Sequence, residues 1–231
     1  MPVYNECPVL DDVVDELLRD IVAKLDDAEL VAVDDCSTDG SGAVLDRRAE
    51  GEPKLRVEHA PANRGHGPSV RRAIDLTDGD WLFQVDSDGQ FVAAEFWDLW
   101  DRRDGADLVI GCRRVRRDPR HRRALTRAVR VAASALAGGR LVDPNAPFKL
   151  VRRDVWDDVA PVIAPDALAP SIMLAVGARA RGWRVVEVPV THLPRRSGPG
   201  SLRPRRLVRF SLRGLGQLLR FRLALRRLPP R

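Results

Sequence analysis

Short apolar segments alternate with amphipathic segments along the first half of this 231-residue chain, and this alternation restricts the fold more than any other feature. Three segments, 30–33, 81–85 and 108–110, have the length and apolar character of buried strands. Apolar residues recur at helical spacing over 9–25 and 96–103, with charged residues between them. The pattern predicts an α/β fold in which helices flank a mostly parallel sheet.

Acidic clusters directly follow two of these predicted strands. The first cluster is Asp34-Asp35, and the second is Asp86-Ser87-Asp88. Ligands of open α/β sheets bind beyond the carboxyl ends of the strands, so both clusters are expected to face one cleft. Alternate carboxylates can converge on Mg²⁺ or Mn²⁺, hard cations that take further ligands from substrate phosphates. A solvated acidic turn is the alternative, because Asp-x-Asp is a common sequence.

Charge is segregated by sign along the chain. Residues 1–110 carry 26 acidic and 11 basic side chains, whereas residues 111–231 carry 7 acidic and 28 basic ones. A strongly basic half favours an anionic partner, which leaves a phosphorylated ligand, an anionic membrane surface or nucleic acid as candidates. Nucleic acid is disfavoured, because no aromatic stacking positions lie among the arginines and no nucleic-acid-binding motif is present.

The end of the chain predicts a basic amphipathic helical tail. Leu and Arg alternate at helical spacing from Arg205 onward, and the residues after 190 include 12 Arg and no acid. We therefore divide the chain into a domain of residues 1–201 and a tail of residues 202–231. Such a helix can lie in the headgroup region of an anionic membrane. Packing against the domain, with the arginines in solvent, is the alternative.

Neither a membrane span nor a signal peptide is recognisable. No apolar run approaches the roughly 20 residues of a span, and residues 1–6 lack the charged and apolar regions of a secretion signal. Cys7, Cys36 and Cys112 are too widely spaced for a disulfide framework or a zinc site. The prediction is a cytoplasmic protein bound peripherally to the inner face of the cell membrane.

The first strand departs from the pattern. Residues 2–6 are typical of the end of a strand and the loop after it, while the body of that strand is missing. A parallel sheet would normally have its nucleating strand there. We expect either a start codon assigned too late, which we favour, or a truncated strand.

Several short motifs occur in a fixed order, and their combination is more specific than any one of them. They are PVYNE (2–6), VDDCSTDGS (33–41), NRGHG (63–67), DSDGQ (86–90), GCR (111–113), DPNAPFK (143–149) and VPV (188–190), followed by Arg195 and Gly198. To about residue 201 the chain resembles the inverting family 2 glycosyltransferases, the group that includes dolichyl-phosphate mannose synthases. The resemblance implies a GT-A nucleotide-diphospho-sugar transferase fold and a nucleotide-sugar donor.

The resemblance also implies roles for individual residues on the donor side. The nucleoside would be bound by Pro2, Tyr4, Glu6, Val33 and Asp35. The metal, Mg²⁺ or Mn²⁺, would be held by Asp86, Asp88 and Gln90, with Ser87 near the diphosphate. Lys149 would face the phosphates, and Arg195 would lie on a loop that closes over the donor. His66 stands where the family has a lysine, and we expect it to be an ordinary loop residue.

The acceptor is inferred from the basic half. Arg113 and Arg127 match positions that engage the acceptor phosphate in the dolichyl-phosphate enzymes, although a solvated basic face is an equal alternative for Arg127. A hydroxyl acceptor requires a general base, whereas a lipid phosphate is largely ionised at neutral pH. Asp143 is the candidate base, and a loop-capping role before Pro144 is its alternative. With Asp88 and Asp143 as catalytic residues, we predict transfer of a hexose to a polyprenyl phosphate.

Three other functions stay open at this point. The acceptor could be a hydroxyl of a soluble or cell-envelope sugar, the chain could be a non-catalytic sugar-nucleotide binder, or it could be a basic nucleic-acid-binding module. The donor is equally open among GDP-mannose, UDP-glucose and UDP-N-acetylhexosamines.

Overall fold

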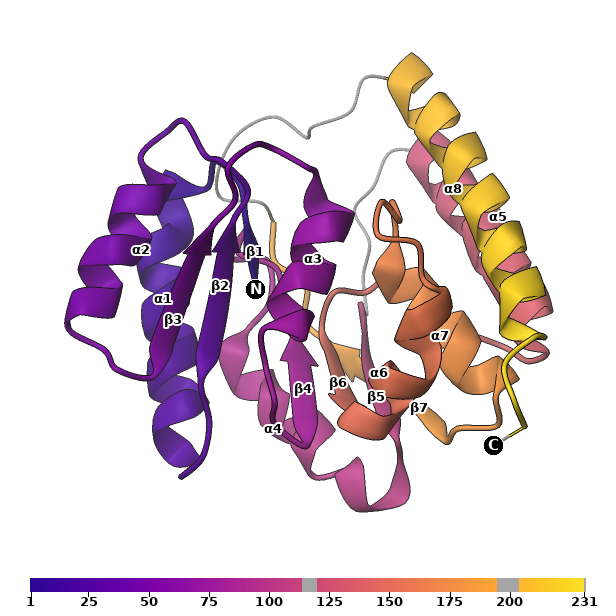
Figure 1. Ribbon diagram of the computed structural model, residues 1–231, viewed down its shortest axis with the longest axis horizontal. Helices are drawn as coiled ribbons and strands as arrows, with labels where there is room; N and C mark the ends of the chain where they lie inside the picture. Colours follow the sequence, from indigo (N-terminus) through magenta and orange to yellow (C-terminus); the bar gives the residue numbers. More distant parts are fainter. Residues whose placement is uncertain (114–119, 195–203, 231) are drawn as a thin grey trace.

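The strands form two sheets that stand beside each other (Figure 1). The computed structural model describes residues 1–113, 120–194 and 204–230. The first sheet is parallel and has the order β1-β2-β3, made of β1 (Pro2–Val3), β2 (Leu30–Asp34) and β3 (Leu55–His59). The second has the order β4-β6-β5-β7, made of β4 (Trp81–Gln84), β5 (Leu108–Arg113), β6 (Lys149–Arg152) and β7 (Val185–Val190).

One strand of the second sheet runs against the others. β6 is antiparallel to both β4 and β5, whereas β5 and β7 are parallel. Nothing in the sequence indicates this strand, because β6 has only four residues and begins and ends with a basic one, so no apolar alternation is visible.

Helices cover both sheets and account for most of the remaining chain. They are α1 (Cys7–Asp20), α2 (Ser41–Glu50), α3 (His66–Asp75), α4 (Phe96–Trp100), α5 (Arg120–Ala137), α6 (Arg153–Val159), α7 (Pro170–Ala180) and α8 (Pro204–Leu225). Single 3₁₀ turns lie at Val22–Lys24, Ala93–Glu95, Arg103–Gly105 and Ala160–Val162. α3 packs against β1, β2 and β4, so it joins the two sheets.

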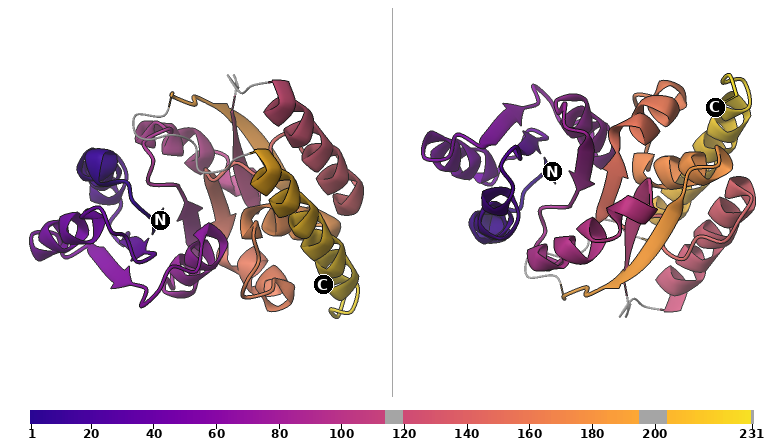
Figure 2. Two further views of the ribbon diagram at one scale, coloured as in Figure 1. Left: turned by 90° about the horizontal axis from the view of Figure 1, so that it is seen from above. Right: turned by 90° about the horizontal axis from the view of Figure 1, so that it is seen from below.

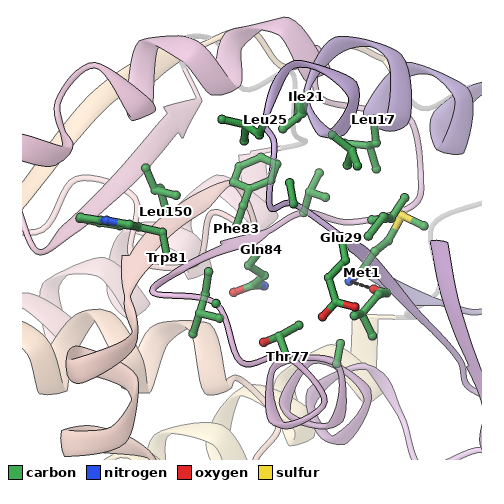
Figure 3. Close-up of a pocket in the computed structure, with 18 of the residues that line it drawn as sticks. Met1, Leu17, Ile21, Leu25, Glu29, Thr77, Trp81, Phe83, Gln84 and Leu150 are labelled. Atoms are coloured by element: carbon green, nitrogen blue, oxygen red, sulfur yellow. Dashed lines mark hydrogen bonds between the residues drawn. The ribbon is translucent and has the colours of Figure 1, made fainter. Parts of the chain in front are cut away.

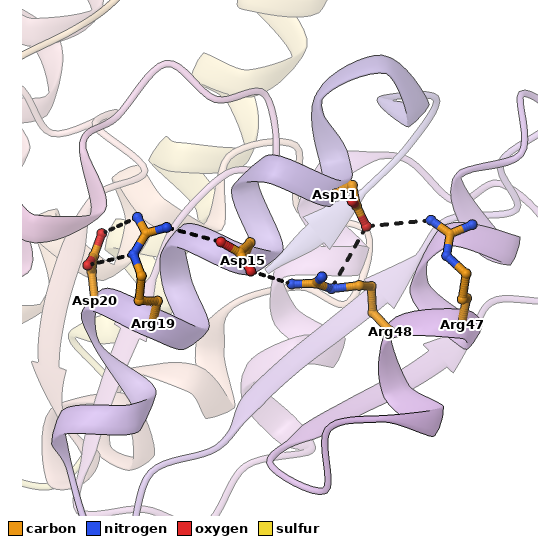
Figure 4. A network of polar contacts seen from close by, with 6 residues as sticks. All are labelled: Asp11, Asp15, Arg19, Asp20, Arg47 and Arg48. Atoms are coloured by element: carbon orange, nitrogen blue, oxygen red, sulfur yellow. Dashed lines mark hydrogen bonds and ion pairs between the residues drawn. The ribbon is translucent and has the colours of Figure 1, made fainter.

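Three acids of α1, Asp11, Asp15 and Asp20, are paired with arginines of the same half of the molecule (Figure 4). Asp15 lies 3.0 Å from Arg19 and 2.9 Å from Arg48 on α2. Exposed ion pairs of this kind contribute little to stability. They do show that part of the acidic excess of residues 1–110 is neutralised locally, away from the ends of the strands.

α8 lies side by side with α5 at the opposite end of the molecule from α1 and α2 (Figures 1 and 2). One face of α8 is part of the main core, where Leu218, Phe221 and Leu225 are buried. The opposite face leaves Leu212 and Leu223 more than half exposed, at 66% and 58%. The helix thus packs on the domain and still presents apolar side chains to the outside. In the described part of the chain, no helix is long and apolar enough to cross a membrane.

Candidate active site

The carboxylate at the end of β2 holds the glycine-containing loop. Asp35 is 2% exposed. Its Oδ1 accepts the backbone N–H of Arg64 at 2.8 Å, and its Oδ2 accepts that of Gly65 at 2.7 Å. Its carbonyl accepts a hydrogen bond from the Asn63 side chain. Asp35, predicted to bind the nucleoside, is therefore already hydrogen-bonded through both carboxylate oxygens.

The neighbouring acid, Asp34, also has a partner for each carboxylate oxygen. Asp34 is 4% exposed. Its Oδ1 accepts the backbone N–H of Ser37 at 3.0 Å, and its Oδ2 lies 3.0 Å from His59 Nδ1. The other ring nitrogen of His59 lies 2.9 Å from Asp46. The pKa of His59 is raised mainly by its hydrogen bond to Asp34 and next by its hydrogen bond to Asp46.

The other residues predicted to bind the nucleoside gather where β1 meets β2. Parallel pairing aligns Pro2 with Val33. After β1, Glu6 is buried, whereas the Tyr4 ring is 48% exposed at the surface. The structure thus brings all five of these predicted residues to one end of the first sheet.

Asn5 links the loop after β1 to the loop after β2, a role that was not predicted from the sequence. Its φ of +54° lies in the left-handed region, which Asn tolerates better than most residues. Its backbone N–H donates to Ser37 Oγ at 3.0 Å, and its Oδ1 accepts the N–H of Thr38 at 2.8 Å. The loops that follow β1 and β2 are therefore locked to each other.

The second acidic cluster follows β4 and contains one carboxylate oxygen without a hydrogen bond. Asp86 Oδ1 is buried and has no hydrogen-bond partner among the described residues. Asp88 Oδ1 accepts the backbone N–H of Gln90 at 3.1 Å. The Gln90 side chain donates to the carbonyl of Leu193 at 3.0 Å, which orients its amide. Ser87, between the two acids, is buried.

These residues fit a hard divalent cation. A buried carboxylate oxygen without a donor is a group that a cation would satisfy. Asp86, Asp88 and Gln90 offer oxygen ligands, as Mg²⁺ and Mn²⁺ prefer. Within the described ranges, no three His, Cys, Asp or Glu side chains are grouped so as to hold a metal. A cation here would therefore depend on water and on phosphate oxygens of a ligand for the rest of its coordination.

His66 lies at the same place, contrary to the expectation of an ordinary loop residue. It is the first residue of α3, preceded by Gly65 with a φ of +93°. His66 Nε2 lies 3.7 Å from Asp86 Oδ1. The imidazole is therefore placed to approach anionic groups bound beside Asp86.

Arg113 and Asp143 are paired with each other. Arg113 Nε donates to Asp143 Oδ2 at 2.7 Å, and Nη2 donates to Oδ1 at 2.8 Å. The two side chains are only 10% and 7% exposed. Such a bidentate pair fixes both groups and gives each carboxylate oxygen of Asp143 a hydrogen bond from Arg113. The arrangement disfavours the general-base role predicted for Asp143.

Glu187 on β7 holds the loop that carries Asp143, and the sequence analysis did not single it out. Glu187 Oε1 accepts the backbone N–H groups of Val142 at 2.7 Å and Asp143 at 3.1 Å. The signal was present, because an acid within the apolar run Val185–Val190 is unusual for a strand.

Lys149 lies behind the site. Its side chain is fully buried at the start of β6, and its Nζ donates to the carbonyl of Ala146. Burial lowers the pKa of Lys149 to about 8, although the charge of Asp143 opposes this shift. In this position the ammonium group contacts the protein backbone, so facing phosphates, as predicted, would require it to turn outward.

A cavity of about 370 Å³ opens beside the second acidic cluster. Its polar end is lined by His66, Asp86, Asp88, Gln90 and Arg113. Its remaining walls are largely apolar and come mainly from α5, α7 and α8, with Val129, Ile172, Met173, Leu215 and Leu218 among them; loop residues, including Asn145 and His192, complete the lining. Nothing in the sequence distinguishes these apolar residues from an ordinary core, which is why they were not predicted.

The two remaining predicted arginines lie elsewhere. Arg127 is exposed on α5, next to the cavity-lining residue Thr126 but not itself in the wall. Arg195 lies outside the described residues.

Comparison with known proteins identifies the family. The sequence profile of glycosyl transferase family 2 matches residues 1–163. A polyprenol monophosphomannose synthase from Mycolicibacterium smegmatis is 31% identical over 219 residues, covering 86% of this chain and 77% of that protein. An undecaprenyl-phosphate mannosyltransferase from Micrococcus luteus is 29% identical over 211 residues, covering 87% and 85%. The chain belongs to glycosyl transferase family 2.

Solved structures of other enzymes have the same fold as this family 2 glycosyltransferase. Glucosyl-3-phosphoglycerate synthase from Mycobacterium tuberculosis, solved with Mn²⁺, UDP and phosphoglyceric acid, has a TM-score of 0.72 at 21% identity, covering 96% of this chain and 76% of that one. Mannosyl-3-phosphoglycerate synthase from Rubrobacter xylanophilus has a TM-score of 0.69 at 18% identity, covering 99% and 75%. The predicted family and the predicted GT-A fold are thus confirmed.

Proposed function

We propose that this family 2 glycosyltransferase moves a hexose from a nucleotide-diphospho-sugar to a polyprenyl phosphate at a membrane surface, with inversion and with a divalent metal. One observation carries the proposal. The cavity beside Asp86 and Asp88 has a polar, charged end and an apolar wall. A ligand with a phosphate head and a hydrocarbon chain matches both parts, whereas a sugar acceptor would leave the apolar wall unused.

The donor would bind across the ends of β2 and β4. Asp86, Asp88 and Gln90 would hold Mg²⁺ or Mn²⁺, and Ser87 would lie near the diphosphate. The metal would neutralise negative charge on the departing nucleoside diphosphate. His66, 3.7 Å from Asp86, adds a second group that can approach those phosphates.

The acceptor would place its phosphate near Arg113. A phosphate monoester is largely ionised at neutral pH, so its oxygen can attack the anomeric carbon without a general base. This agrees with the bidentate pairing of Asp143 by Arg113. In the proposed reaction Asp143 positions the guanidinium group. The names of the M. smegmatis and M. luteus relatives, a polyprenol monophosphomannose synthase and an undecaprenyl-phosphate mannosyltransferase, also support this choice.

The outer face of α8 would rest on the membrane. Leu212, Leu219 and Leu223 form an exposed apolar row, at 66%, 47% and 58% exposure. Arg213, 63% exposed, and Arg220 lie beside this row. Leucines that enter the interface and arginines that attract anionic lipid headgroups are the usual components of peripheral membrane binding. Residues of α5 and α8 line the cavity, which suits an acceptor that arrives from the bilayer.

The decisive experiment is a transfer assay with a panel of nucleotide-sugars and Mg²⁺ or Mn²⁺. Short-chain polyprenyl phosphate in detergent, the corresponding free polyprenol, and soluble sugars serve as acceptors. We expect product only with the phosphate and only with metal. Transfer to the soluble sugars, with none to the phosphate, would replace the proposed acceptor by a hydroxyl.

A matched pair of variants tests the cavity itself. Leu215→Asp changes the apolar wall, whereas Leu212→Asp introduces the same charge on the same helix outside the cavity. In detergent, Leu215→Asp should raise the KM for polyprenyl phosphate about tenfold or more and leave the donor KM unchanged. Leu212→Asp should change neither, and it should weaken flotation with anionic vesicles at low salt. Equal acceptor KM values in the two variants would exclude this cavity as the acceptor site.

A further inference from the structure

A buried glutamine of α8 holds the loop that leads into α7. Gln217 is 9% exposed. Its Oε1 accepts the backbone N–H of Leu168 at 2.9 Å, and its Nε2 donates to the carbonyl of Asp166 at 3.2 Å. Both backbone groups belong to the 163–169 segment, which contains neither helix nor strand. A side chain that satisfies two backbone groups of an irregular segment fixes the position of that segment.

The same segment is tied to β4 at its end. Ser171, in the first turn of α7, donates from its Oγ to Gln84 Oε1 at 2.8 Å. Gln84 is the last residue of β4 and lines a second cavity, of about 640 Å³, between β2 and β4 (Figure 3). Asp86 follows Gln84 by two residues. The 163–169 segment is therefore held by α8 on one side and by the strand that leads to the candidate metal site on the other.

The first turn of α3 packs directly on the 163–169 segment. A Cβ atom on Gly67 would overlap the carbonyl oxygen of Ala167 and would lie 3.1 Å from Pro170 Cδ. Glycine permits such a close approach because it has no side chain. Since no side chain separates the two backbones, the position of Ala167 determines where the first turn of α3 can lie.

His66 lies between two fixed points. On one side of it, Asp35 accepts the backbone N–H of Gly65 at 2.7 Å. On the other side, Gly67 rests on the 163–169 segment. Gly65 has no side chain to cap α3, so the start of this helix depends on contacts from outside it. These contacts keep His66 Nε2 at 3.7 Å from Asp86 Oδ1.

We propose that Gln217 is a positioning residue for the diphosphate of the donor. It holds the 163–169 segment, on which α3 begins, and so keeps His66 beside Asp86. Gln217 does not itself line the 370 Å³ cavity, so it acts through the segment that it binds. The inference rests on the proposed diphosphate site at Asp86 and not on the identity of the acceptor. It connects that site to α8, the helix proposed to rest on the membrane.

Two variants of the full chain with matched losses test this role. Gln217→Met nearly keeps the volume of the side chain and removes both hydrogen bonds. Arg222→Met is the control, because Arg222 of α8 donates to the carbonyl of Leu136 on α5 at 2.7 Å, away from the 163–169 segment. Calorimetry with Mn²⁺ and inorganic pyrophosphate probes the diphosphate site directly. Gln217→Met should weaken pyrophosphate binding about tenfold, and Arg222→Met by less than about twofold.

A double-mutant cycle with His66→Gln shows whether Gln217 acts through His66. Once His66 is replaced, Gln217→Met should weaken pyrophosphate binding by less than about twofold, because the two losses then are not additive. Hydrogen exchange at Ser69 provides a second readout, since its N–H donates to the carbonyl of Gly65 at 3.3 Å in the first turn of α3. This exchange should become about tenfold faster in Gln217→Met and stay unchanged in Arg222→Met.

The outcomes separate this inference from the proposed function. Additive losses in the cycle, or equal losses in Gln217→Met and Arg222→Met, would overturn the inference. So would pyrophosphate binding and Ser69 exchange that Gln217→Met leaves unchanged, and the proposed metal site would then stand. If the unsubstituted protein did not bind Mn²⁺ with pyrophosphate, the proposed diphosphate site would be wrong, and the inference would fail with it.

Discussion

Two strands of this enzyme end in nearly the same sequence but leave their acids in different states. β2 ends in Asp34-Asp35, and all four carboxylate oxygens of this pair have partners within the protein. β4 leads into Asp86-Ser87-Asp88, where Asp86 Oδ1 is buried without a hydrogen-bond partner. Buried polar atoms are rarely left unpaired in native proteins. The first pair therefore organises loops, whereas the second includes a buried carboxylate oxygen that a cation would satisfy.

The largest expected effect of this difference is on activity at β4. Asp86→Asn should lower kcat about a hundredfold or more, because several kcal/mol of charge neutralisation on the leaving diphosphate are lost. The free energy of unfolding should change by less than about 1 kcal/mol, since no hydrogen bond to Asp86 Oδ1 is removed. Steady-state kinetics with Mn²⁺ and urea unfolding measure the two quantities.

Ligand-induced stabilisation provides the control for Asp86→Asn. Mn²⁺ with the nucleoside diphosphate of the donor found active in the transfer assay should raise the Tm of the unsubstituted protein, because a ligand that binds only the native state stabilises it. The same addition should leave the Tm of Asp86→Asn unchanged. Full activity of this variant, or an equal rise in Tm, would mean that Asp86 does not hold the metal.

Substitution at β2 should produce the opposite pattern. Asp35→Ala removes two charge-assisted hydrogen bonds to the backbone of Arg64 and Gly65 and leaves both N–H groups without their partner. We expect a loss of about 2–4 kcal/mol in the free energy of unfolding. Urea unfolding and hydrogen exchange at Gly65 check this. If Asp35→Ala lost less free energy of unfolding than Asp86→Asn, the two acidic clusters would not differ in the way described.

Sequence could predict the strand ends but not the state of their acids. The alternation of strands and helices placed Asp35 and Asp86 correctly at the ends of strands, because that pattern is local. Whether Asp35 is hydrogen-bonded depends on Arg64 and Gly65, which lie 29 and 30 residues further on. These hydrogen-bond partners come together only in the tertiary structure. The local sequence around Asp35 therefore does not reveal them.

The features that the sequence did not reveal also depend on distant contacts. β6 is too short and too polar to be recognised, and it forms because β4 and β5 offer it an edge on each side. The sequence left Asp143 open as a base or a loop-capping residue, and its pairing with Arg113, 30 residues away, is visible only in the structure. The apolar wall of the proposed acceptor cavity has the sequence pattern of a core. Family motifs predicted the candidate donor residues, whereas this cavity became visible only in the structure.

A smaller effect is expected at Asp143, where a carboxylate near the active site is again occupied by the protein. Asp143→Asn should lower kcat by less than about tenfold at saturating polyprenyl phosphate, whereas loss of a general base typically lowers it 10²–10⁴-fold. Steady-state rates across pH 6–9 measure this. A loss of a hundredfold or more, with a normal KM for the acceptor, would make Asp143 the base and favour a hydroxyl acceptor.

Arg113→Gln is the companion variant. If Arg113 binds the acceptor phosphate, its loss should raise the KM for polyprenyl phosphate about tenfold, which corresponds to about 1.4 kcal/mol. The KM for the nucleotide-sugar should not change. A larger effect on the donor would assign Arg113 to the diphosphate instead.

The smallest expected effect is on stability, at His59, whose side chain contacts Asp34 of the β2 cluster. Hydrogen bonds to Asp34 and Asp46 raise the pKa of His59 above its ordinary value of 6.5. A group whose pKa is raised by folding stabilises the protein fully below its unfolded pKa, and this contribution is lost as pH rises through the folded pKa. His59→Gln should therefore be less stable than the unsubstituted protein at pH 5.5, and the difference should shrink above pH 7. Because the His59 side chain is 43% exposed, the effect should be modest in urea unfolding. A difference that grows with pH would show that Asp34 is not paired with a protonated His59, and would leave one oxygen of the β2 cluster as free as that of Asp86.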